Sequence, residues 1–179
     1  MATITLGYMP LFVLLYLLIF IQSSSSNDLV DKVCVYNDDP TYCTAILNSD
    51  GRTPNADLTG LGEISIDLGL VLATNISNEI IWKNNSATND PRLTQCFNTC
   101  FNWYDTAKDS LVNASDALSS KAYYNMQDYA GSAGQFGLWC EEAFKQPPPR
   151  QSPLTTENNN FYHLTQAMVV ISNSLIRGF

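Results

Sequence analysis

The sequence has little positive charge. Its 179 residues include 9 Lys and Arg against 17 Asp and Glu, which gives a formal net charge of −8. Residues 1–26 contain no charged side chain, so the whole acidity belongs to residues 27–179. This balance argues against binding to nucleic acid or to anionic membrane surfaces. We interpret the acidity as a solubility feature, and electrostatic attraction to a basic partner is the alternative.

Histidine is nearly absent. His163 is the only one, and no nucleophile is paired with a candidate general base. We therefore expect His163 to have a surface or interface role. The acidic pairs Asp38-Asp39 and Glu141-Glu142 have no partners of the metal-binding type. The sequence thus predicts no enzymatic activity, no metal site and no cofactor.

The N-terminus lacks Lys and Arg but contains an apolar run. Residues 7–21 are too few to span a bilayer comfortably, and the serines at 23–26 suit a cleavage region. This pattern predicts a signal peptide over residues 1–26 and a secreted protein of one domain over 27–179. A retained anchor is the alternative, because no basic residue precedes the run.

Strand-like alternation is absent, and four segments show helical periodicity instead. A four-helix bundle with up-down-up-down topology over 57–178 is the simplest way to bury four such seams. The apolar seams are Leu61, Ile64, Leu68, Leu72, Ile76 and Ile80; then Leu93, Phe97, Cys100, Tyr104, Ala107, Leu111, Ala114 and Leu118; then Met126, Tyr129, Ala133, Phe136, Cys140 and Ala143; and last Phe161, Leu164, Met168, Ile171 and Leu175.

Capping and breaking residues set the expected helix ends. The first helix begins near Asp57. The second begins with Asp90 as its N-cap, followed by Pro91 at the first helical position. The prolines at 147–149 end the third, and Ser152 or a following threonine caps the fourth. Residues 27–50 form a separate helical hairpin.

Five cysteines follow the predicted signal peptide, which favours disulfides over metal binding. Cys34 and Cys43 enclose a short loop that can close within the hairpin. Cys96 and Cys100 are one helical turn apart, which is too far for a disulfide between them. Either could pair with Cys140 through a tertiary contact, so two disulfides and one leftover thiol are expected.

These features resemble the plant invertase and pectin methylesterase inhibitor family. The resemblance rests on Cys-x8-Cys at 34–43, on Cys-Phe-Asn-Trp-Tyr at 100–104 and on Cys-Glu-Glu-Ala-Phe at 140–144. Stretches 56–65 and 152–159 are similar to a branch named for invertase inhibition that includes a plane-tree pollen allergen. The family pattern implies that Cys100 pairs with Cys140, which leaves Cys96 free. Because Cys96 flanks the seam of the second helix, we expect it to be a buried, inert thiol.

The resemblance implies a plant inhibitor that binds a cell-wall enzyme in the apoplast and blocks its active site. The enzyme is pectin methylesterase or, as the alternative, a cell-wall or vacuolar invertase. Family members that act on invertase use a Pro-Lys-Phe loop between the second and third helices. Here that turn reads Ser-Ser-Lys-Ala-Tyr-Tyr over 119–124, so Lys121 and Tyr123 are the substitute cation and aromatic.

The missing loop motif favours pectin methylesterase slightly, because that binding mode uses polar helix faces. The residues expected on those faces are Asn102, Asp105, Lys108, Asp109, Gln127 and Asp128.

Three Asn-x-Ser sequons offer glycosylation sites at Asn75, Asn84 and Asn113. We expect Asn84 to lie in a polar connection over 83–90 and Asn113 to lie off the seam, so both should be accessible. Asn75 is adjacent to Ile76, in the part of the first helix where the apolar residues are spaced four apart, and we expect it to be shielded.

Two further interpretations stay open. An inhibitor-like domain also precedes some pectin methylesterases; because the sequence ends a few residues after the fourth helix, we expect a free inhibitor instead. A non-inhibitory or allergen-like bundle that binds a small ligand is the other, since a cluster of aromatic residues could line a pocket. Those residues are Trp103, Tyr104, Tyr123, Tyr124, Tyr129, Phe136 and Trp139.

Overall fold

A computed structural model describes residues 28–87 and 89–178, which form helices and no strands. Residues 28–34 are helical, and the predicted signal peptide over 1–26 lies outside the described residues. The elements in chain order are α2 (Pro40–Asn48), the short 3-10 helix η1 (Thr53–Asn55), α3 (Leu58–Ser86), α4 (Pro91–Ser119), α5 (Tyr123–Lys145) and α6 (Thr155–Arg177).

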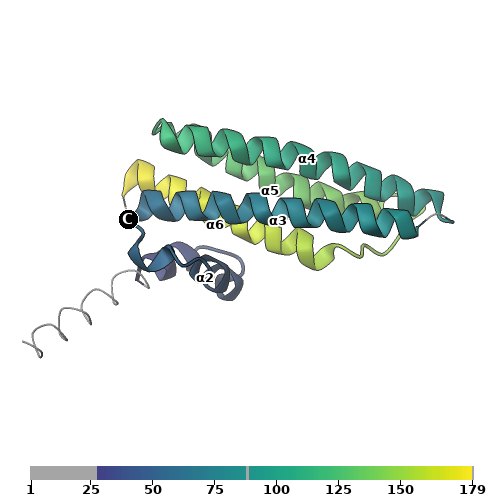
Figure 1. Ribbon diagram of the computed structural model, residues 1–179, viewed down its shortest axis with the longest axis horizontal. Coiled ribbons are helices and arrows are strands. Elements are labelled where there is room, and N and C mark those ends of the chain that lie inside the picture. The colour runs from purple at the N-terminus through teal and green to yellow at the C-terminus, as the bar shows by residue number, and fades with distance from the viewer. Residues whose placement is uncertain (1–27, 88, 179) are drawn as a thin grey trace, which may run out of the picture.

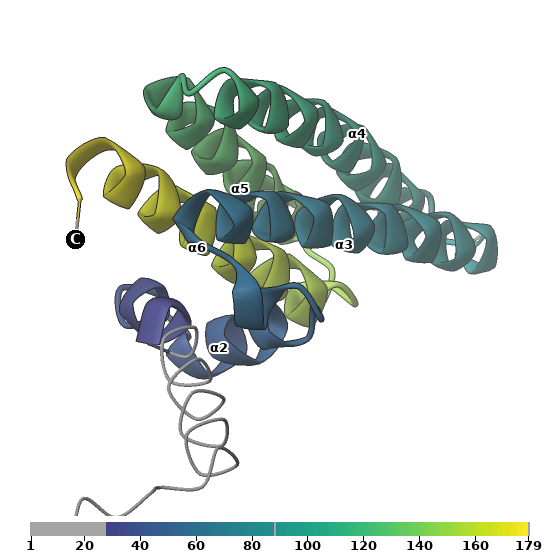
Figure 2. The same ribbon diagram turned by 60° about the vertical axis from the view of Figure 1, so that its left-hand side comes forward.

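The four long helices form the predicted bundle (Figure 1). α4 packs against α3 and α5, and α6 packs against the same two helices, so each helix has two neighbours. The hairpin of residues 28–48 lies outside the bundle beside α3 and α6, on the side away from α4 in both views (Figure 2). The expected all-α bundle with an N-terminal disulfide-linked hairpin is confirmed.

Aspartate side chains cap the first two bundle helices. Asp57 accepts a hydrogen bond from the backbone N–H of Gly60, and Asp90 accepts from Arg92 and Leu93. Both helix starts agree with the sequence prediction. The start of α6 does not, because its N-cap is Leu154 and no side chain caps it. Ser152 instead accepts from the N–H of Leu154, in the turn before the helix.

The buried face of α3 differs from the predicted seam. Leu68 and Leu72 are only half-buried, whereas Gly69 and Ala73 are fully buried. Small residues turn inwards here because α3 comes close to its neighbours: a Cβ on Gly69 would overlap the methyl group of Met168. By length and hydropathy α3 could cross a membrane, but 44% of its apolar window is buried inside the bundle.

The buried face of α5 is also displaced by one position at three places. Ala130, Gly137 and Phe144 are buried, where Tyr129, Phe136 and Ala143 were expected. Glycines at 134 and 137 allow α5 to approach α6 closely, which leaves the larger side chains on the flanks of the helix. The predicted seam of α4 is right from Phe97 to Leu118.

A polar network crosses the core between α4, α5 and α6. The Tyr104 hydroxyl donates to Oδ1 of Asn158 at 2.8 Å, and Nδ2 of Asn158 donates to Glu141 at 2.8 Å. Tyr104 and Asn158 are both fully buried. Because the buried hydroxyl and the buried amide satisfy each other only in this arrangement, the network fixes the register of the three helices.

Candidate functional site

Two disulfides fix the frame that carries the candidate surfaces. Cys34 pairs with Cys43 across the hairpin, with their Cα atoms 5.5 Å apart. Cys100 of α4 pairs with Cys140 of α5, with their Cα atoms 4.6 Å apart. This second pairing is the one that the family resemblance implies, and it ties the two helices whose outer faces were expected to bind a partner.

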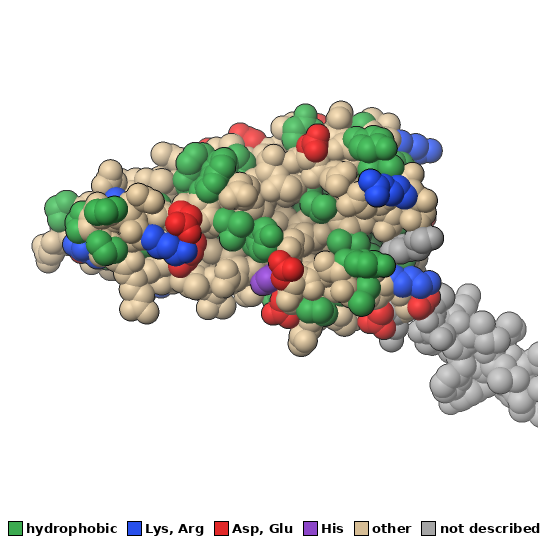
Figure 3. Space-filling view, turned by 180° about the vertical axis from the view of Figure 1, so that it is seen from behind, with side chains coloured by type: hydrophobic (Ala, Val, Ile, Leu, Met, Phe, Trp, Pro, Cys, Tyr) green, Lys and Arg blue, Asp and Glu red, His purple; other side chains and the backbone are tan. Residues whose placement is uncertain are grey.

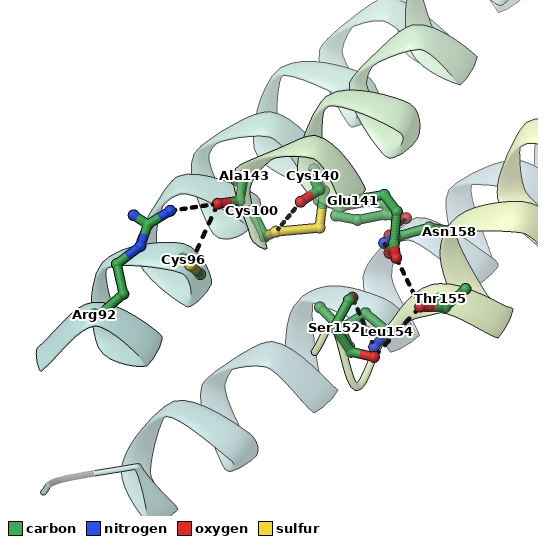
Figure 4. The surroundings of a disulfide bond; sticks show 11 residues. Arg92, Cys96, Cys100, Cys140, Glu141, Ala143, Ser152, Leu154, Thr155 and Asn158 are labelled. Atoms are coloured by element: carbon green, nitrogen blue, oxygen red, sulfur yellow. Dashed lines mark hydrogen bonds between the residues drawn. A yellow bond between two sulfur atoms is a disulfide. The ribbon is translucent and has the colours of Figure 1, made fainter. Parts of the chain in front are cut away.

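Cys96 is a buried free thiol beside that second disulfide. Its Sγ lies 3.5 Å from the backbone oxygen of Ala143, which also accepts from the Arg92 guanidinium at 2.6 Å (Figure 4). Burial raises the pKa of the Cys96 thiol, although the nearby Arg92 opposes the shift. The thiol therefore stays protonated at neutral and acidic pH, and its position suits an inert core residue.

The turn between α4 and α5 closes tightly on the end of α4. The N–H of Ala122 donates to the oxygen of Ala117, and the N–H of Lys121 donates to that of Leu118. Lys121 has φ of 59°, in the left-handed region that usually favours glycine at this position. These bonds define a Schellman motif, so the turn ends the helix and does not project as a loop.

The side chains of this turn differ in exposure. Lys121 is exposed, but Tyr123 begins α5 and is half-buried. Its neighbour Tyr124 is 67% exposed, so Tyr124 and not Tyr123 is the accessible aromatic of the turn. Within the described residues, no carboxylate forms an ion pair with Lys121. An accessible cation and an accessible aromatic thus lie together at this end of the bundle.

The outer ridge of α4 carries three of the residues expected on helix faces. Asn102, Asp105 and Asp109 are all exposed, and their spacing of three and four places them on one side of the helix. Lys108 is different, because it is half-buried and forms an ion pair with Asp105 at 3.1 Å.

The two expected residues of α5 lie apart from that ridge. Gln127 is half-buried, and its Nε2 donates to Oδ1 of Asn173 at 3.2 Å, so it faces α6. Asp128 is exposed on the outer side of α5. The six residues predicted to bind a partner therefore do not form one surface. The sequence could not reveal this, because the assignment of an off-seam residue to one flank or the other depends on where the seam of α5 lies.

Three of the aromatic residues that could line a ligand pocket form a cluster at the outer junction of α4 and α5. The rings of Trp103 and Phe136 stack with centroids 5.4 Å apart, and Trp139 lies 5.0 Å from Trp103. Trp103 and Trp139 line a groove of about 500 Å³. Tyr104 is buried in the core, so the aromatic residues proposed to enclose a ligand do not line one cavity.

Two of the three sequon asparagines are exposed on the outer faces of long helices. Asn113 lies on α4, as expected. Asn75 lies on α3 and is exposed too, which corrects the expectation that it is shielded. The buried side of α3 here consists of Ile76, as predicted, and Ser77 on its other side, so Asn75 turns out.

Asn84 is the least accessible sequon asparagine. It lies in the last turn of α3 and not in a connection, because α3 continues to Ser86. Asn84 is half-buried, and its Nδ2 donates to Oδ1 of Asn98 on α4 at 2.9 Å. An N-glycan would attach to this same nitrogen. The hydrogen bond to Asn98 therefore occupies the atom that glycosylation would modify.

His163 joins the hairpin to the bundle. Its backbone oxygen accepts from Nδ2 of Asn37 at 2.6 Å, and its ring lies 6.4 Å from that of Tyr42. Gln166, one turn later, donates to Asp38 at 2.7 Å. These contacts suit the interface role expected for His163. Among the residues that the structure describes, no group of three His, Cys, Asp or Glu side chains could hold a metal ion.

The described residues form a disulfide-linked helical hairpin on a four-helix bundle. Residues 28–175 match the family model described as plant invertase/pectin methylesterase inhibitor. The match covers most of the chain. The protein belongs to this family, whose members are named as inhibitors of enzymes and are not enzymes themselves.

Relatives carry both inhibitor names. A pectinesterase inhibitor from Actinidia deliciosa is 35% identical over 151 residues, which is 84% of this chain and 81% of the relative. A Platanus acerifolia protein that carries an invertase-inhibitor name is 30% identical over 165 residues, 89% of this chain and 92% of its own. The similarity to plane-tree proteins expected from residues 56–65 and 152–159 is therefore confirmed.

The fold has solved counterparts. A crystal structure of a mutant pectin methylesterase inhibitor from Arabidopsis superposes with a TM-score of 0.69 and 22% identity, covering 79% of this chain and 93% of that one. At this identity the similarity supports the fold alone.

Proposed function

We propose that this protein inhibits a plant pectin methylesterase by laying rigid helix faces over the enzyme's active site. A bundle whose α4 and α5 are joined by a disulfide presents its outer side chains at fixed spacings. Little conformational entropy is then lost on binding. The 35% identical relative from Actinidia deliciosa, named a pectinesterase inhibitor, supports the same target.

The observation that favours this target is the closed turn between α4 and α5. Its three residues are held by backbone hydrogen bonds to the last turn of α4, so no loop extends from this end of the bundle. An inhibitor that inserts a loop into an active site needs a projecting segment. The outer faces of the helices are the larger accessible surfaces, and they suit a broad contact over a cleft.

Invertase inhibition is the second candidate, and the side chains of the same turn favour it. Lys121 is exposed with no carboxylate partner in the described chain, and Tyr124 is 67% exposed. A cation and an aromatic side by side could anchor the protein in an acidic pocket lined with carboxylates. We refer to this pair as the turn anchor.

The proposed location is the apoplast. Two disulfides suit the oxidising secretory pathway, and the apolar segment at 7–21 suits a signal peptide. An Arabidopsis relative, 30% identical over 154 residues, is named a cell wall and vacuolar inhibitor of fructosidase, which is compatible with this route.

A titration of the purified, oxidised protein against a plant pectin methylesterase and a plant cell-wall invertase at mildly acidic pH tests the proposal. We expect stoichiometric inhibition of the methylesterase and none of the invertase. Inhibition of invertase alone would replace the first proposal by the second.

Substitution of the turn anchor separates the two binding modes. Lys121→Ala with Tyr124→Ala should leave the inhibition constant for pectin methylesterase within a few-fold of wild type. The same pair should weaken an invertase complex by roughly 100-fold, because an anchor residue in a desolvated pocket carries much of the binding energy. A loss of methylesterase inhibition in this variant would contradict docking through helix faces.

A further inference from the structure

The sequons are distributed unevenly over the bundle. Asn75 and Asn84 lie on α3 and Asn113 lies on α4. α5, α6 and the hairpin of residues 28–48 contain no Asn-x-Ser/Thr sequence. A secreted protein can therefore receive N-glycans on one half of the bundle only.

A glycan on Asn113 would stand on the outer ridge of α4. Asn113 is four residues after Asp109 and eleven after Asn102, so the three side chains lie on the same side of the helix. All three are exposed. A glycan there would cover the ridge and keep a large protein from lying along it. Asn75, exposed near the middle of α3, would do the same for the outer face of that helix.

The hairpin already occupies part of α6. Asn37 donates to the backbone of His163, and Asp38 accepts from the side chain of Gln166. α3 and α4 carry the exposed sequons, and α6 is partly covered by the chain itself. The outer side of α5 contains no sequon and is not covered by the hairpin.

That side of α5 has the composition of an interface. It carries the exposed residues Tyr129 and Trp139 with polar and small residues between them, and we call this set the α5 face: Asp128, Tyr129, Gly131, Ser132, Gln135 and Trp139. Contacts with Trp103 and Phe136 hold the Trp139 ring in place. α5 and α6 lie behind α4 and α3 in Figure 1, so Figure 3 shows their side, with hydrophobic patches separated by polar and charged groups.

We propose that N-glycans on Asn75 and Asn113 shield α3 and α4 and that the target enzyme docks on the α5 face. The inference rests on the proposed inhibition of pectin methylesterase and narrows it to one helix. Aromatic residues held by their neighbours are effective anchors, because little side-chain freedom is lost when they are buried. Trp139 is such an anchor, Tyr129 is a second exposed aromatic on the same face, and the ridge of Asn102, Asp105 and Asp109 takes no part.

A glycan introduced on the α5 face tests the proposal. Tyr129→Asn with Gly131→Thr creates a sequon at two exposed positions, and a Cβ on Gly131 meets open space. Tyr129→Asn with Gly131→Val is the matched control, because valine has the shape of threonine without the hydroxyl that glycosylation requires. Both variants and the wild type are produced in a eukaryotic host that glycosylates, and peptide mass mapping measures the occupancy of each site.

We expect occupancy at Asn75 and Asn113 in a wild-type protein that inhibits pectin methylesterase fully. The variant with threonine at position 131 should inhibit at least roughly 100-fold more weakly than the valine control, and enzymatic removal of the glycans should abolish the difference. Equal inhibition by the two variants, with the new site occupied, would overturn docking on α5. Unoccupied Asn75 and Asn113 would overturn the shield.

A wild-type protein that inhibits neither enzyme would overturn the proposed function, and docking on the α5 face would then be contradicted as well. Failure of the proposed function can be distinguished from failure of docking on the α5 face, because inhibition by the wild type is measured before any variant is compared. Stronger inhibition on changing Asn113→Gln, by tenfold or more, would show that the glycan obstructs the contact and would return the docking surface to α4.

Discussion

Single buried hydroxyl and amide groups set the alignment of the bundle helices. Asn158 is fully buried on α6 and connects Tyr104 of α4 to Glu141 of α5 by two hydrogen bonds of 2.8 Å. Burial raises the pKa of Tyr104, with smaller contributions from Glu157 and Glu141, so the phenol remains protonated and can donate. Removal of one member leaves another buried polar atom without a partner.

Tyr104→Phe should therefore destabilise the protein more than loss of an ordinary hydroxyl. The substitution leaves Oδ1 of Asn158 without a donor in a dry core, at a cost of about 1–3 kcal/mol. Thermal unfolding followed by circular dichroism measures the change, and Tyr124→Phe at the surface is the control. An unchanged unfolding temperature in Tyr104→Phe would show that the network contributes nothing.

Asp90 combines a cap with an ion pair. Its carboxylate accepts from two backbone N–H groups of α4, and the Arg150 guanidinium lies 2.7 Å away. The hydrogen bonds from Arg150 and from Leu93 lower the pKa of Asp90. The folded state thus favours the charged form, so its contribution to stability is complete above the ordinary pKa of aspartate and is lost as pH falls through the lowered value.

Asp90→Ala should lower the unfolding temperature at pH 6 by more than Asp90→Asn, since asparagine keeps the cap and loses only the ion pair. The gap between wild type and Asp90→Asn should close as the pH falls below about 4, because the wild-type carboxylate becomes protonated. Unfolding temperatures measured from about pH 2 to 7 give both comparisons. A gap that stays constant over this range would exclude the ion pair as its cause.

At the level of helices, the sequence predicts some buried faces better than others. The seam of α4 is right from Phe97 to Leu118 because its buried positions are apolar at regular spacings of three and four and most of its outer residues are polar. The seam of α5 was displaced because Gly134 and Gly137 form the buried side while Tyr129 and Phe136 flank it. Hydropathy cannot distinguish a glycine that allows close packing from one that faces solvent.

The same limit explains the candidate sites. The family resemblance implied the disulfide pairing that the structure contains. Cysteine spacing is read directly from the sequence and does not depend on which face of a helix is buried. The exposures of Tyr123 and Asn75 depend on a rotation of one residue about a helix axis. A shift of about 100° per residue moves a side chain from solvent to the core, so a small error in the seam changes the predicted surface.

Two glycines of α5 test this account of the packing. A Cβ on Gly134 would collide with Oγ1 of Thr165 on α6, whereas a Cβ on Gly131 would meet open space. Gly134→Ala should destabilise by roughly 1–3 kcal/mol, because either Thr165 must rotate and lose its hydrogen bond to the backbone of Tyr162 or α5 and α6 must move apart. Gly131→Ala should stabilise by about 0.5–1 kcal/mol, since alanine favours the helix. Chemical denaturation measures both, and similar effects at the two positions would contradict the close α5–α6 contact.

For the whole molecule, the two disulfides act on parts of different size. Cys100–Cys140 joins two neighbouring bundle helices through cysteines that are 40 residues apart in sequence, and both cysteines are fully buried. Cys34–Cys43 closes a hairpin whose buried Val30, Val33 and Leu47 belong to the same apolar core as the bundle. The hairpin also forms hydrogen bonds to α6 through Asn37 and Asp38. Loss of the first linkage loosens the bundle itself, and loss of the second loosens an attached element.

Removal of each disulfide in turn should separate these contributions. Cys100→Ala with Cys140→Ala should lower the free energy of unfolding by roughly 3–4 kcal/mol, because the unfolded chain regains the entropy of a long open loop. Cys34→Ala with Cys43→Ala should leave the main unfolding transition near its wild-type temperature and should increase hydrogen exchange only in residues 28–48.

Both pairs are made with Cys96→Ala, so that no free thiol can form a new disulfide. Denaturant unfolding and hydrogen exchange by mass spectrometry give the two measurements. If loss of Cys34–Cys43 exposed the amides of α6 throughout its length, the hairpin would be a structural part of the bundle, and its cover over α6 would be required for the fold.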